Sequence, residues 1–382
     1  MTSDWLTWLL RLTELIALAY VIIIGLYTYG WFFLLKKNQP SGRPFTSTSI
    51  LIALRNEEAH VESLLDHLSR QTDLPDQCEF IFVDDHSTDQ TRSLLEAFAK
   101  ENSLKKVIVT DSQAEGKKAA LATGLSLATG ELILVTDADC MPGPRWVSCM
   151  VAAYEQSKAS LLLGPVHLRA DRGLFSQLQA LEFMSLIGST AGSASVGLPS
   201  MANGANLAFD RKAIEKTTQL RKDETFASGD DMFLLDAVVR YYGSKAVVFV
   251  AHSDAIVPTE PSASLHEFLI QRLRWVSKSK GYSRLAVIFP AVVVLLFNTS
   301  LVVFLIASLF EVKLLIPGIL FLLLKVFTDY PLLRSVAAFM QNKHLMKWFL
   351  PLTLIYPFYV SLVAISGLTA NVSWKGRSVR KK

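Results

Sequence analysis

Short apolar runs alternate with amphipathic stretches along the first third of the chain. The apolar runs, each short enough for one strand, are residues 49–54, 79–83, 107–109 and 132–135. After the first run, apolar residues recur at helical spacing, at Val61, Leu64, Leu65 and Leu68. Further helices are expected at 90–100, from 117 to 128 and at 232–241. This strand, loop, helix order predicts an α/β domain with a mostly parallel sheet, whose ligand site follows the carboxyl ends of the strands.

Longer apolar segments lie at both ends of the chain. Residues 15–35, 286–310 and 349–370 carry no charge, and each could cross a bilayer core, which needs about 20 residues. A fourth segment, 314–333, contains Lys325 and Asp329. With 51% hydrophobic residues among 382, the chain is too apolar for a purely soluble protein. We therefore expect a globular domain between membrane segments.

The orientation of the chain follows from its basic residues. Residues 15–35 lack the basic start and small-residue cleavage site of a signal peptide, and Lys36, Lys37 and Arg43 follow them. Basic residues stay on the cytosolic side of membrane helices. We therefore interpret the first segment as an anchor and place the central domain in the cytosol.

The C-terminal tail conflicts with a simple count of spans. One span before the central domain and three after it would put the tail outside. The tail nevertheless carries an inside signal, Lys375, Arg377, Arg380, Lys381 and Lys382. Either the tail breaks the rule, or one segment is re-entrant or interfacial. The candidate is 349–370, which is interrupted by Pro351 and Pro357.

Charge, cysteine and motif content narrow the class of protein. The formal charge of +4 is small, and the basic residues cluster near the membrane segments, which favours anionic headgroups over nucleic acid as partner. The three cysteines, Cys78, Cys140 and Cys149, lack metal-ligand spacing and fit a reducing compartment. The histidines form no zinc-type pair. Glycine-rich dinucleotide and P-loop motifs are absent from the sequence, which argues against those enzymes.

Two carboxylates follow the strand at 132–135. Asp137 and Asp139, with one small residue between them, stand where ligands bind in an open α/β sheet. Carboxylate oxygens suit a hard divalent cation such as Mg²⁺ or Mn²⁺. A solvated turn is the alternative reading of an isolated Asp-x-Asp.

Seven motifs in order carry a family resemblance. They are Phe82 to Asp89, Gly116-Lys117, Asp137-Ala138-Asp139, Gly204 to Ala208, Gly229-Asp230-Asp231, Thr259-Glu260-Pro261 and Gln271 to Trp275. Together they resemble the motif set of membrane-bound family 2 glycosyltransferases, the group of cellulose, chitin and hyaluronan synthases and ceramide glucosyltransferase. The resemblance covers about residues 48 to 280 and implies a GT-A-like nucleotide-binding sheet with helices on both faces.

The resemblance implies a donor site on the sheet. Asp139 would bind the metal directly, and Asp137 would reach the ribose or the metal. Asp85 would accept a hydrogen bond from the base, and Lys117 would meet a phosphate. The loop that contains Ala53, Arg55 and Glu57 would cradle the nucleoside. For Asp89 we favour a capping role at the helix that follows, and Lys117 could also be a solvated lysine at a helix start.

The resemblance also implies a general base. Asp231 would take the proton of the acceptor hydroxyl, and Asp230 stands beside it. Direct attack by the acceptor inverts the anomeric centre. The family usually has Glu-Asp where this chain has Asp230-Asp231, a change that shortens one side chain by a methylene and keeps the charge. Both residues could in addition cap the helix that begins there.

An amphipathic stretch follows at residues 265–284. Its apolar side contains Leu265, Phe268, Leu269, Leu273 and Val276, and its charge comes from Arg272, Lys278, Lys280 and Arg284. The pattern alone predicts a helix in the membrane interface. The resemblance adds that Gln271 and Arg274 face the donor diphosphate and that Trp275 forms a platform for the acceptor.

These expectations define four segments. They are an anchor (1–37), a cytosolic GT-A domain (45–258), the amphipathic segment (259–284) and a C-terminal membrane region (285–382). The expected protein sits in the plasma (inner) membrane. It transfers a sugar, with inversion, from a nucleotide diphosphate sugar, UDP being favoured, to a lipid or glycan acceptor. Alternatives are a processive polysaccharide synthase and a non-catalytic protein that binds nucleotide sugars.

Lys325 and Asp329 share one face of a helix because they lie four residues apart. In one interpretation this helix ends near Tyr330-Pro331 and both charges reach the headgroups. In the other, the pair faces the other spans and lines a route for a polar acceptor headgroup.

Overall fold

The computed structural model describes residues 4–36, 40, 42–101, 106–171, 173–217, 230–369, 373–374 and 377–378. The chain forms two compact units. The sheet unit consists of Leu34–Arg169, Met201–Pro261 and Gly376–Lys382. The helical unit consists of Met1–Phe33, Ala170–Ser200 and Ser262–Lys375.

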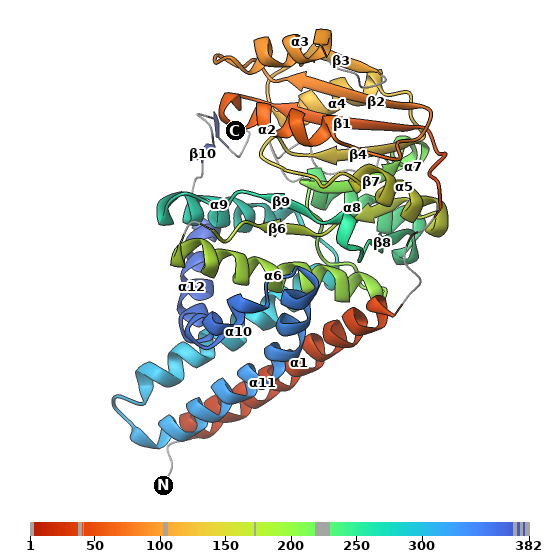
Figure 1. The fold of residues 1–382 in the computed structure, drawn as a ribbon. Coiled ribbons are helices and arrows are strands. Elements are labelled where there is room, and N and C mark those ends of the chain that lie inside the picture. Colours follow the sequence, from red (N-terminus) through yellow and green to blue (C-terminus); the bar gives the residue numbers. More distant parts are fainter. Residues whose placement is uncertain are drawn as a thin grey trace. The chain divides into compact units, whose positions relative to one another are not determined.

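A seven-stranded sheet is the centre of the sheet unit (Figure 1). Its strands are β1 (Thr48–Leu54), β2 (Cys78–Asp84), β3 (Val107–Asp111), β4 (Leu132–Thr136), β5 (Leu161–Leu163), β7 (Asn206–Asp210) and β8 (Val247–Phe249). The order is β3-β2-β1-β4-β7-β5-β8. β7 runs antiparallel to β4 and β5, and the other neighbours are parallel. The predicted mostly parallel α/β sheet is confirmed.

The central strands are buried because helices pack against the sheet. All residues of β2 and β4 are buried, as continuous apolar runs in a parallel sheet require. The helices are α2 (Glu58–Ser69), α3 (Thr91–Glu101), α4 (Lys117–Leu127), α5 (Trp146–Ser157), α7 (Arg211–Thr217) and α8 (Asp230–Tyr242). The predicted face of α2 is buried at Val61, Leu64, Leu65 and Leu68. Shorter elements complete the unit: β6 (Val166–Leu168), η3 (Ser244–Ala246), η4 (Ser253–Ala255) and β9 (Val257–Thr259).

The helical unit contains the long apolar helices. Its elements are α1 (Asp4–Leu35), α6 (Leu174–Ser195), α9 (Leu265–Lys278), η5 (Ser279–Gly281), α10 (Leu285–Ala307), η6 (Val312–Leu314), α11 (Leu315–Phe339), η7 (Lys343–Trp348) and α12 (Phe349–Thr369). One short strand of this unit follows, β10 (Ser373–Trp374), and β11 (Arg377–Ser378) comes after it in the last segment of the sheet unit. Three helical stretches in the described chain, Leu6–Leu35, Leu285–Ala307 and Lys343–Gly367, are long and apolar enough to cross a membrane. Membrane association follows from their composition.

Small residues let α6 pack closely in this unit. A β-carbon on Gly192 of α6 would collide with the backbone of Tyr27 in α1, and one on Gly30 would collide with the backbone of Gly192. Gly188, one turn earlier on α6, faces Leu332 and Val336 of α11. Such close backbone approach is common between membrane helices. α6 therefore belongs with the apolar helices, although the sequence pattern did not single it out.

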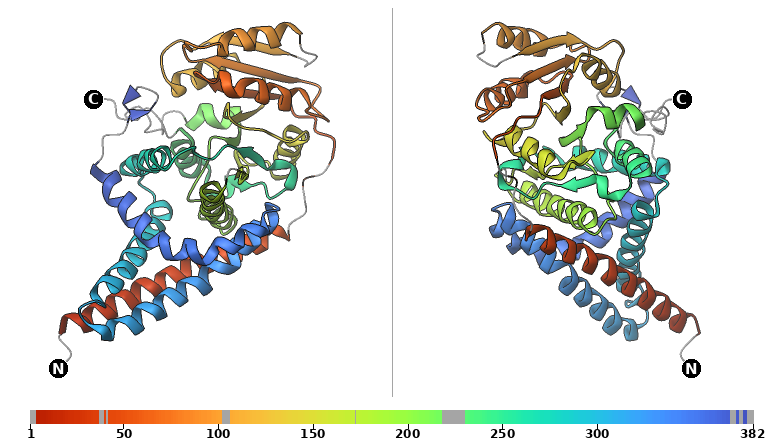
Figure 2. Two further views of the ribbon diagram at one scale, coloured as in Figure 1. Left: turned by 60° about the vertical axis from the view of Figure 1, so that its left-hand side comes forward. Right: turned by 90° about the vertical axis from the view of Figure 1, so that its right-hand side faces the viewer.

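The ion pair in α11 faces the other helices. Lys325 is only 3% exposed, and its Nζ lies 2.6 Å from Asp329 Oδ2 and 2.9 Å from Tyr20 Oη of α1. The Tyr20 hydroxyl donates to Asp329 Oδ1 at 2.6 Å. α1 and α11 run side by side in both views of Figure 2, and α11 continues through Pro331 to Phe339. The interpretation that this helix ends near Tyr330-Pro331 is therefore wrong.

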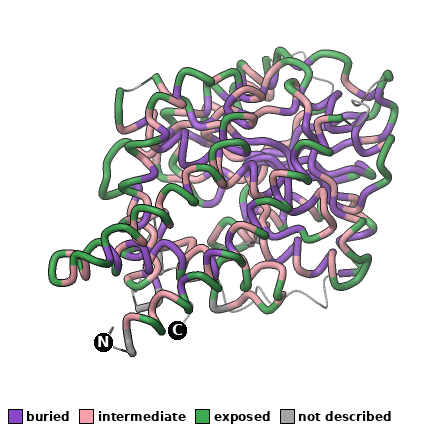
Figure 3. Tube along the Cα trace, turned by 90° about the horizontal axis from the view of Figure 1, so that it is seen from below, coloured by how far each residue is buried: buried purple, intermediate pink, exposed green. Residues whose placement is uncertain are grey.

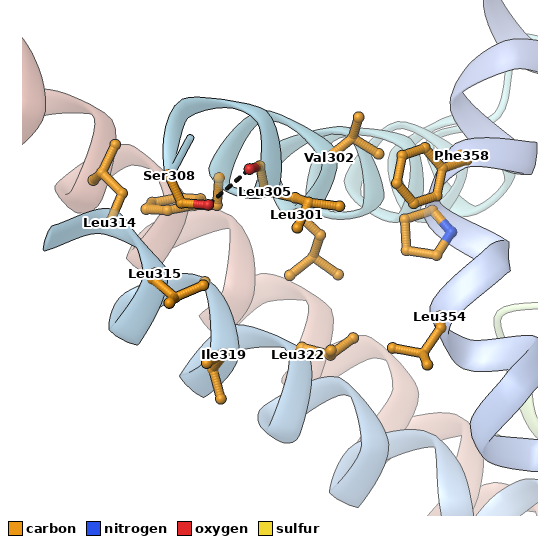
Figure 4. Close-up of a pocket in the computed structure, with 13 residues that line it drawn as sticks. Leu301, Val302, Leu305, Ser308, Leu314, Leu315, Ile319, Leu322, Leu354 and Phe358 are labelled. Carbon is orange, nitrogen blue, oxygen red and sulfur yellow. Dashed lines mark hydrogen bonds between the residues drawn. The ribbon is translucent and has the colours of Figure 1, made fainter. Parts of the chain in front are cut away.

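Apolar side chains are exposed along these helices, as a lipid environment allows. Figure 3 shows exposed residues along the helices nearest the marked N-terminus. A cavity of about 130 Å³ lies between α10, α11 and α12 and is lined by leucine, isoleucine and phenylalanine side chains (Figure 4). Ser308, its one labelled polar residue, donates to the carbonyl of Leu305 at 2.7 Å. The basic tail lies outside the described residues, apart from the backbone of Arg377.

Candidate active site

The turn after β4 carries the two predicted metal ligands. It contains Asp137 and Asp139 and is fixed against β9, because Cys140 bridges to Thr259 and the Met141 N–H donates to the Pro258 carbonyl at 2.8 Å. The Cys140 N–H closes the turn on the Asp137 carbonyl at 3.2 Å. The buried strand thus delivers both carboxylates to the carboxyl edge of the sheet, as predicted.

Negative charge accumulates at this turn. Burial, followed by the carboxylates of Asp137 and Glu57, raises the pKa of Asp139, and a hydrogen bond with Thr259 opposes the rise. A divalent cation would relieve this repulsion, so the carboxylates fit a metal. Within the described residues no three His, Cys, Asp or Glu side chains are grouped to hold a metal. The remaining ligands would have to be substrate oxygens or water, which is typical of Mg²⁺ sites.

Lys117 lies at the start of α4, directly after Gly116. Gly116 has φ 107°, a conformation that favours glycine, and its N–H donates to Asp85 Oδ1 at 2.8 Å. The ammonium of Lys117 contacts Asp137 Oδ1. The structure therefore brings Lys117 to the pair of carboxylates, and its predicted contact with a phosphate stays a prediction.

The loops after β1 and β2 form one wall of the predicted nucleoside site. Arg55 Nη1 lies 3.9 Å from Asp85 Oδ2 and donates to the Asp85 carbonyl at 3.3 Å. The Thr88 N–H donates to Asn56 Oδ1 at 2.8 Å, and Asn56 has φ 50°. Ala53 stands opposite Val83 in the parallel pairing of β1 and β2. These residues, which are predicted to bind the nucleotide sugar, lie together at the ends of the strands.

Asp89 has the structural role that we favoured. Its Oδ1 accepts from the Thr91 N–H at 3.0 Å at the start of α3, and its Oδ2 accepts from the Glu58 N–H at 3.1 Å. One carboxylate therefore fixes the starts of two helices.

Asp231 and Lys117 both lie next to Gly204. Asp231 Oδ2 accepts from the Gly204 N–H at 3.1 Å, and Oδ1 accepts from its neighbour Met232 at 2.8 Å. A β-carbon on Gly204 would lie 3.9 Å from Asp231 Oδ2 and 4.0 Å from Lys117 Nζ. The expected base and the expected phosphate ligand therefore both lie near Gly204. The side chain of Asp230 lies outside the described residues, although its backbone begins α8.

Asn206, which belongs to one of the motifs, is structural. It is buried in β7, and its Nδ2 donates to the carbonyls of Pro165 at 2.8 Å and Ala255 at 2.7 Å. Its Oδ1 accepts from Trp146 Nε1 at 3.0 Å. Sequence reasoning missed this role and the contact of Thr259 with Asp139. A polar residue directly before a short apolar run was the available signal for Asn206.

The last motif lies on α9 in the helical unit. α9 begins at an N-cap, Ser264, whose side chain accepts from the Glu267 N–H at 3.2 Å, and it carries Gln271, Arg274 and Trp275. Arg272 is 4% exposed and Lys278 is 8% exposed. The expectation that both supply surface charge at a membrane interface is therefore wrong, because they are buried within the protein.

A family comparison agrees with these observations. Residues 49–217 match the model of glycosyl transferase family 2. This segment is a family 2 glycosyltransferase domain. The glycosyltransferase domain includes β1 to β4, the Asp137 and Asp139 turn and β7.

Curated relatives match about a third of the chain. A β-monoglucosyldiacylglycerol synthase of Nostoc sp. is 33% identical over 152 residues, which is 38% of this chain and 31% of the relative. A dodecaprenyl-phosphate galacturonate synthase of Rhizobium johnstonii is 32% identical over 128 residues, which is 33% of this chain and 38% of the relative. The matched segments therefore span about a third of these relatives.

A solved structure shares the fold over most of the chain. The mannosyltransferase of Pyrobaculum calidifontis, solved in complex with GDP-Man and Mn²⁺, has a TM-score of 0.58 and 19% identity. The likeness covers 94% of this chain and 99% of that structure, so it includes the helical regions as well as the glycosyltransferase domain.

Proposed function

We propose that the protein transfers a sugar from a nucleotide diphosphate sugar to a lipid acceptor, with a divalent cation and inversion at the anomeric carbon. The observation that carries the proposal is that Lys117 contacts Asp137, beside Asp139, and that Lys117 and Asp231 both lie near Gly204. This arrangement combines anionic metal ligands, a cation for phosphate and a carboxylate base at one sheet edge.

The residues of the donor site have separate tasks. Asp139 and Asp137 would hold Mg²⁺ or Mn²⁺, which supplies Lewis-acid stabilisation of the leaving nucleoside diphosphate. Lys117 neutralises phosphate charge. Arg55, Glu57, Asp85 and Ala53 form the wall against which the nucleoside binds. This wall determines the specificity for the nucleotide base and the sugar of the donor. Both UDP-sugars and GDP-sugars are candidates.

Asp231 acts as the general base. Its carboxylate accepts two backbone N–H groups, which fix its orientation and leave lone pairs for the acceptor hydroxyl. It takes the proton as the acceptor oxygen bonds to the anomeric carbon and the bond to the diphosphate breaks. Attack from the side opposite the leaving group gives inversion.

A lipid acceptor is supported by the helical unit and by the relatives. Three stretches could cross a membrane, and both relatives are named for lipid products, a glucosyldiacylglycerol and a prenyl-phosphate sugar. Within the helical unit, Gln271 and Arg274 are proposed donor contacts and Trp275 the acceptor platform. We propose further that the glycosyltransferase domain faces the cytosol at the inner membrane.

The test uses the purified full chain in lipid nanodiscs. UDP-glucose, UDP-galactose and GDP-mannose are supplied with Mg²⁺ or Mn²⁺, and dioleoylglycerol or decaprenyl phosphate serves as acceptor. We expect nucleotide release and transfer with at least one pair, and loss of both on adding EDTA. Asp139→Asn should abolish transfer and metal-dependent donor binding together, since it removes a charged metal ligand.

Asp111→Asn is the matched control, because Asp111 also ends a parallel strand but is exposed and paired with Arg92. It should keep wild-type activity. Chelator-resistant transfer by the wild type would refute the metal requirement, and long polymers in place of one added sugar would favour a processive synthase. Retention of the donor anomer, measured by NMR, would refute inversion.

A further inference from the structure

Arg272 is the most enclosed cation of α9. It lies between Gln271 and Trp275 in the chain but is not itself one of the motif's defining positions. Only 4% of its surface is exposed. A buried guanidinium is costly unless its donors are satisfied, so the groups around it show what it holds in place.

Three acceptors from three helices surround the guanidinium. Nη2 lies 2.5 Å from Glu182 Oε2 of α6, Nε donates to the Tyr359 hydroxyl of α12 at 3.1 Å, and Nη1 donates to Gln271 Oε1 at 2.7 Å. α12 packs against both α9 and α6, as Figure 1 also shows. Arg272 therefore joins α9 to the neighbouring helices.

The same guanidinium covers an indole ring. Its central carbon lies 4.2 Å from the Trp275 ring centroid and 4.6 Å from that of Phe268. Both rings are within the range of cation–π attraction. They stand three residues after and four residues before Arg272, so they share its face of α9.

We propose that Arg272 is a positioning residue that orients Gln271 and Trp275 for the transfer reaction; this inference rests on the proposed function. The guanidinium has only donors, so the amide of Gln271 must turn its oxygen toward Arg272. Its NH₂ group is then directed away from Arg272 and remains available to donate to a substrate oxygen. The chemistry of the neighbour thus decides which way the amide points.

Trp275 is held by the same group. An indole ring has two χ angles, and a cation stacked on it restricts both. The guanidinium is itself fixed by Glu182 and Tyr359. Lysine could not replace it, because an ammonium is a point charge that cannot match three acceptors in a plane while stacking on a ring. Arg272 therefore fixes the orientation of both Gln271 and Trp275.

The experiment compares Arg272→Lys with the wild type in nanodiscs. It uses the donor and the acceptor, dioleoylglycerol or decaprenyl phosphate, that support wild-type transfer. Transfer and donor hydrolysis by water are measured on the same samples. We expect the ratio of transfer to hydrolysis to fall about tenfold to a hundredfold, the scale of an ångström-sized misplacement. Tyr359→Phe, which removes one contact to Arg272 and leaves the charge, should lower the ratio less.

The ratio separates positioning from stability. A variant that merely folds less well loses both rates in proportion, so an unchanged ratio overturns the proposal, whether or not the rates fall. Arg92→Lys is the matched control, because Arg92 also contacts two side-chain carboxylates, Glu96 and Asp111, but on the exposed face of α3. It should leave the ratio unchanged. Wild-type protein without any transfer would instead contradict the proposed function itself.

Discussion

Asp231 accepts one backbone hydrogen bond on each carboxylate oxygen, from Gly204 and from Met232. Such a carboxylate cannot rotate without losing a bond, so its free lone pairs keep one direction. Asparagine has a single acceptor oxygen and could satisfy only one of the two donors. The two hydrogen bonds thus favour a carboxylate at this position, and the proposed role as general base requires one as well.

We predict that Asp231→Asn keeps donor binding and lowers turnover about a hundredfold or more, the usual scale for loss of a general base. Calorimetry with the nucleotide product and metal measures binding, and single-turnover transfer measures the rate. Asp236→Asn, on the same helix but in an ion pair with Arg240, is the control and should be near wild type. Equal losses of binding and turnover would make Asp231 a binding residue.

Sequence reasoning found residues whose chemistry is visible in their spacing. Asp137, Asp139 and Lys117 follow strands or start helices, and the structure brings them together. It did not find the contact of Thr259 with Asp139 or the structural task of Asn206, because these roles depend on β9 and β7 returning from far along the chain. Arg272 was assigned to the surface because an amphipathic pattern shows which face is polar but not what covers that face.

At the scale of elements, α6 is the longest of the helices that the pattern missed. It is rich in alanine, serine and glycine, so it lacks the long aliphatic stripe that marks a membrane or core helix. Its small residues become informative only beside a partner. Gly192 is the point of closest approach, where Tyr27 backbone atoms of α1 occupy the space that a side chain would need.

We predict that Gly192→Ala lowers the melting temperature of the purified protein. A collision with backbone cannot be relieved by a rotamer change, and overpacking typically costs about 1–3 kcal/mol. Gly25→Ala is the control, because Gly25 of α1 has open space around its Cα. It should be neutral or stabilise by about 0.5–1 kcal/mol, as helix propensity favours alanine. A melting temperature for Gly192→Ala equal to that of Gly25→Ala would contradict the close packing of α1 on α6.

At the scale of the whole molecule, the side of the membrane on which the C-terminus lies depends on whether α12 crosses the membrane. α10 and α11 pack together and are joined by residues 308–314, so α11 returns the chain to the side where α10 began. α12 then packs along α9, with Tyr359 against Phe268 and Gly367 against Val276. α9 also carries Glu267, Arg274 and Lys278. A helix with these charges, such as α9, is costly inside the hydrocarbon core of a membrane. Because α12 packs along α9, an interfacial position of α12 is favoured despite its length.

We therefore predict that the C-terminus lies on the same side as the glycosyltransferase domain. A cysteine at Ser378 should react with an impermeant maleimide only after cells are permeabilised, and one at Val312, between α10 and α11, should react in intact cells. The native cysteines give little background, because Cys78, Cys140 and Cys149 are all buried. Labelling of both positions in intact cells would show that α12 crosses the membrane.

The two units are interleaved along the chain, and this sets the order in which the protein can be completed during synthesis. The sheet unit is interrupted by Ala170–Ser200, and Asp231 and β8 are made only afterwards. α6 is therefore synthesised before β8 and Asp231, which complete the sheet and its predicted catalytic residues. A segment cut at residues 45–258 would carry α6 without α1 and α11. The sheet unit therefore cannot be completed before α6 of the helical unit has been made.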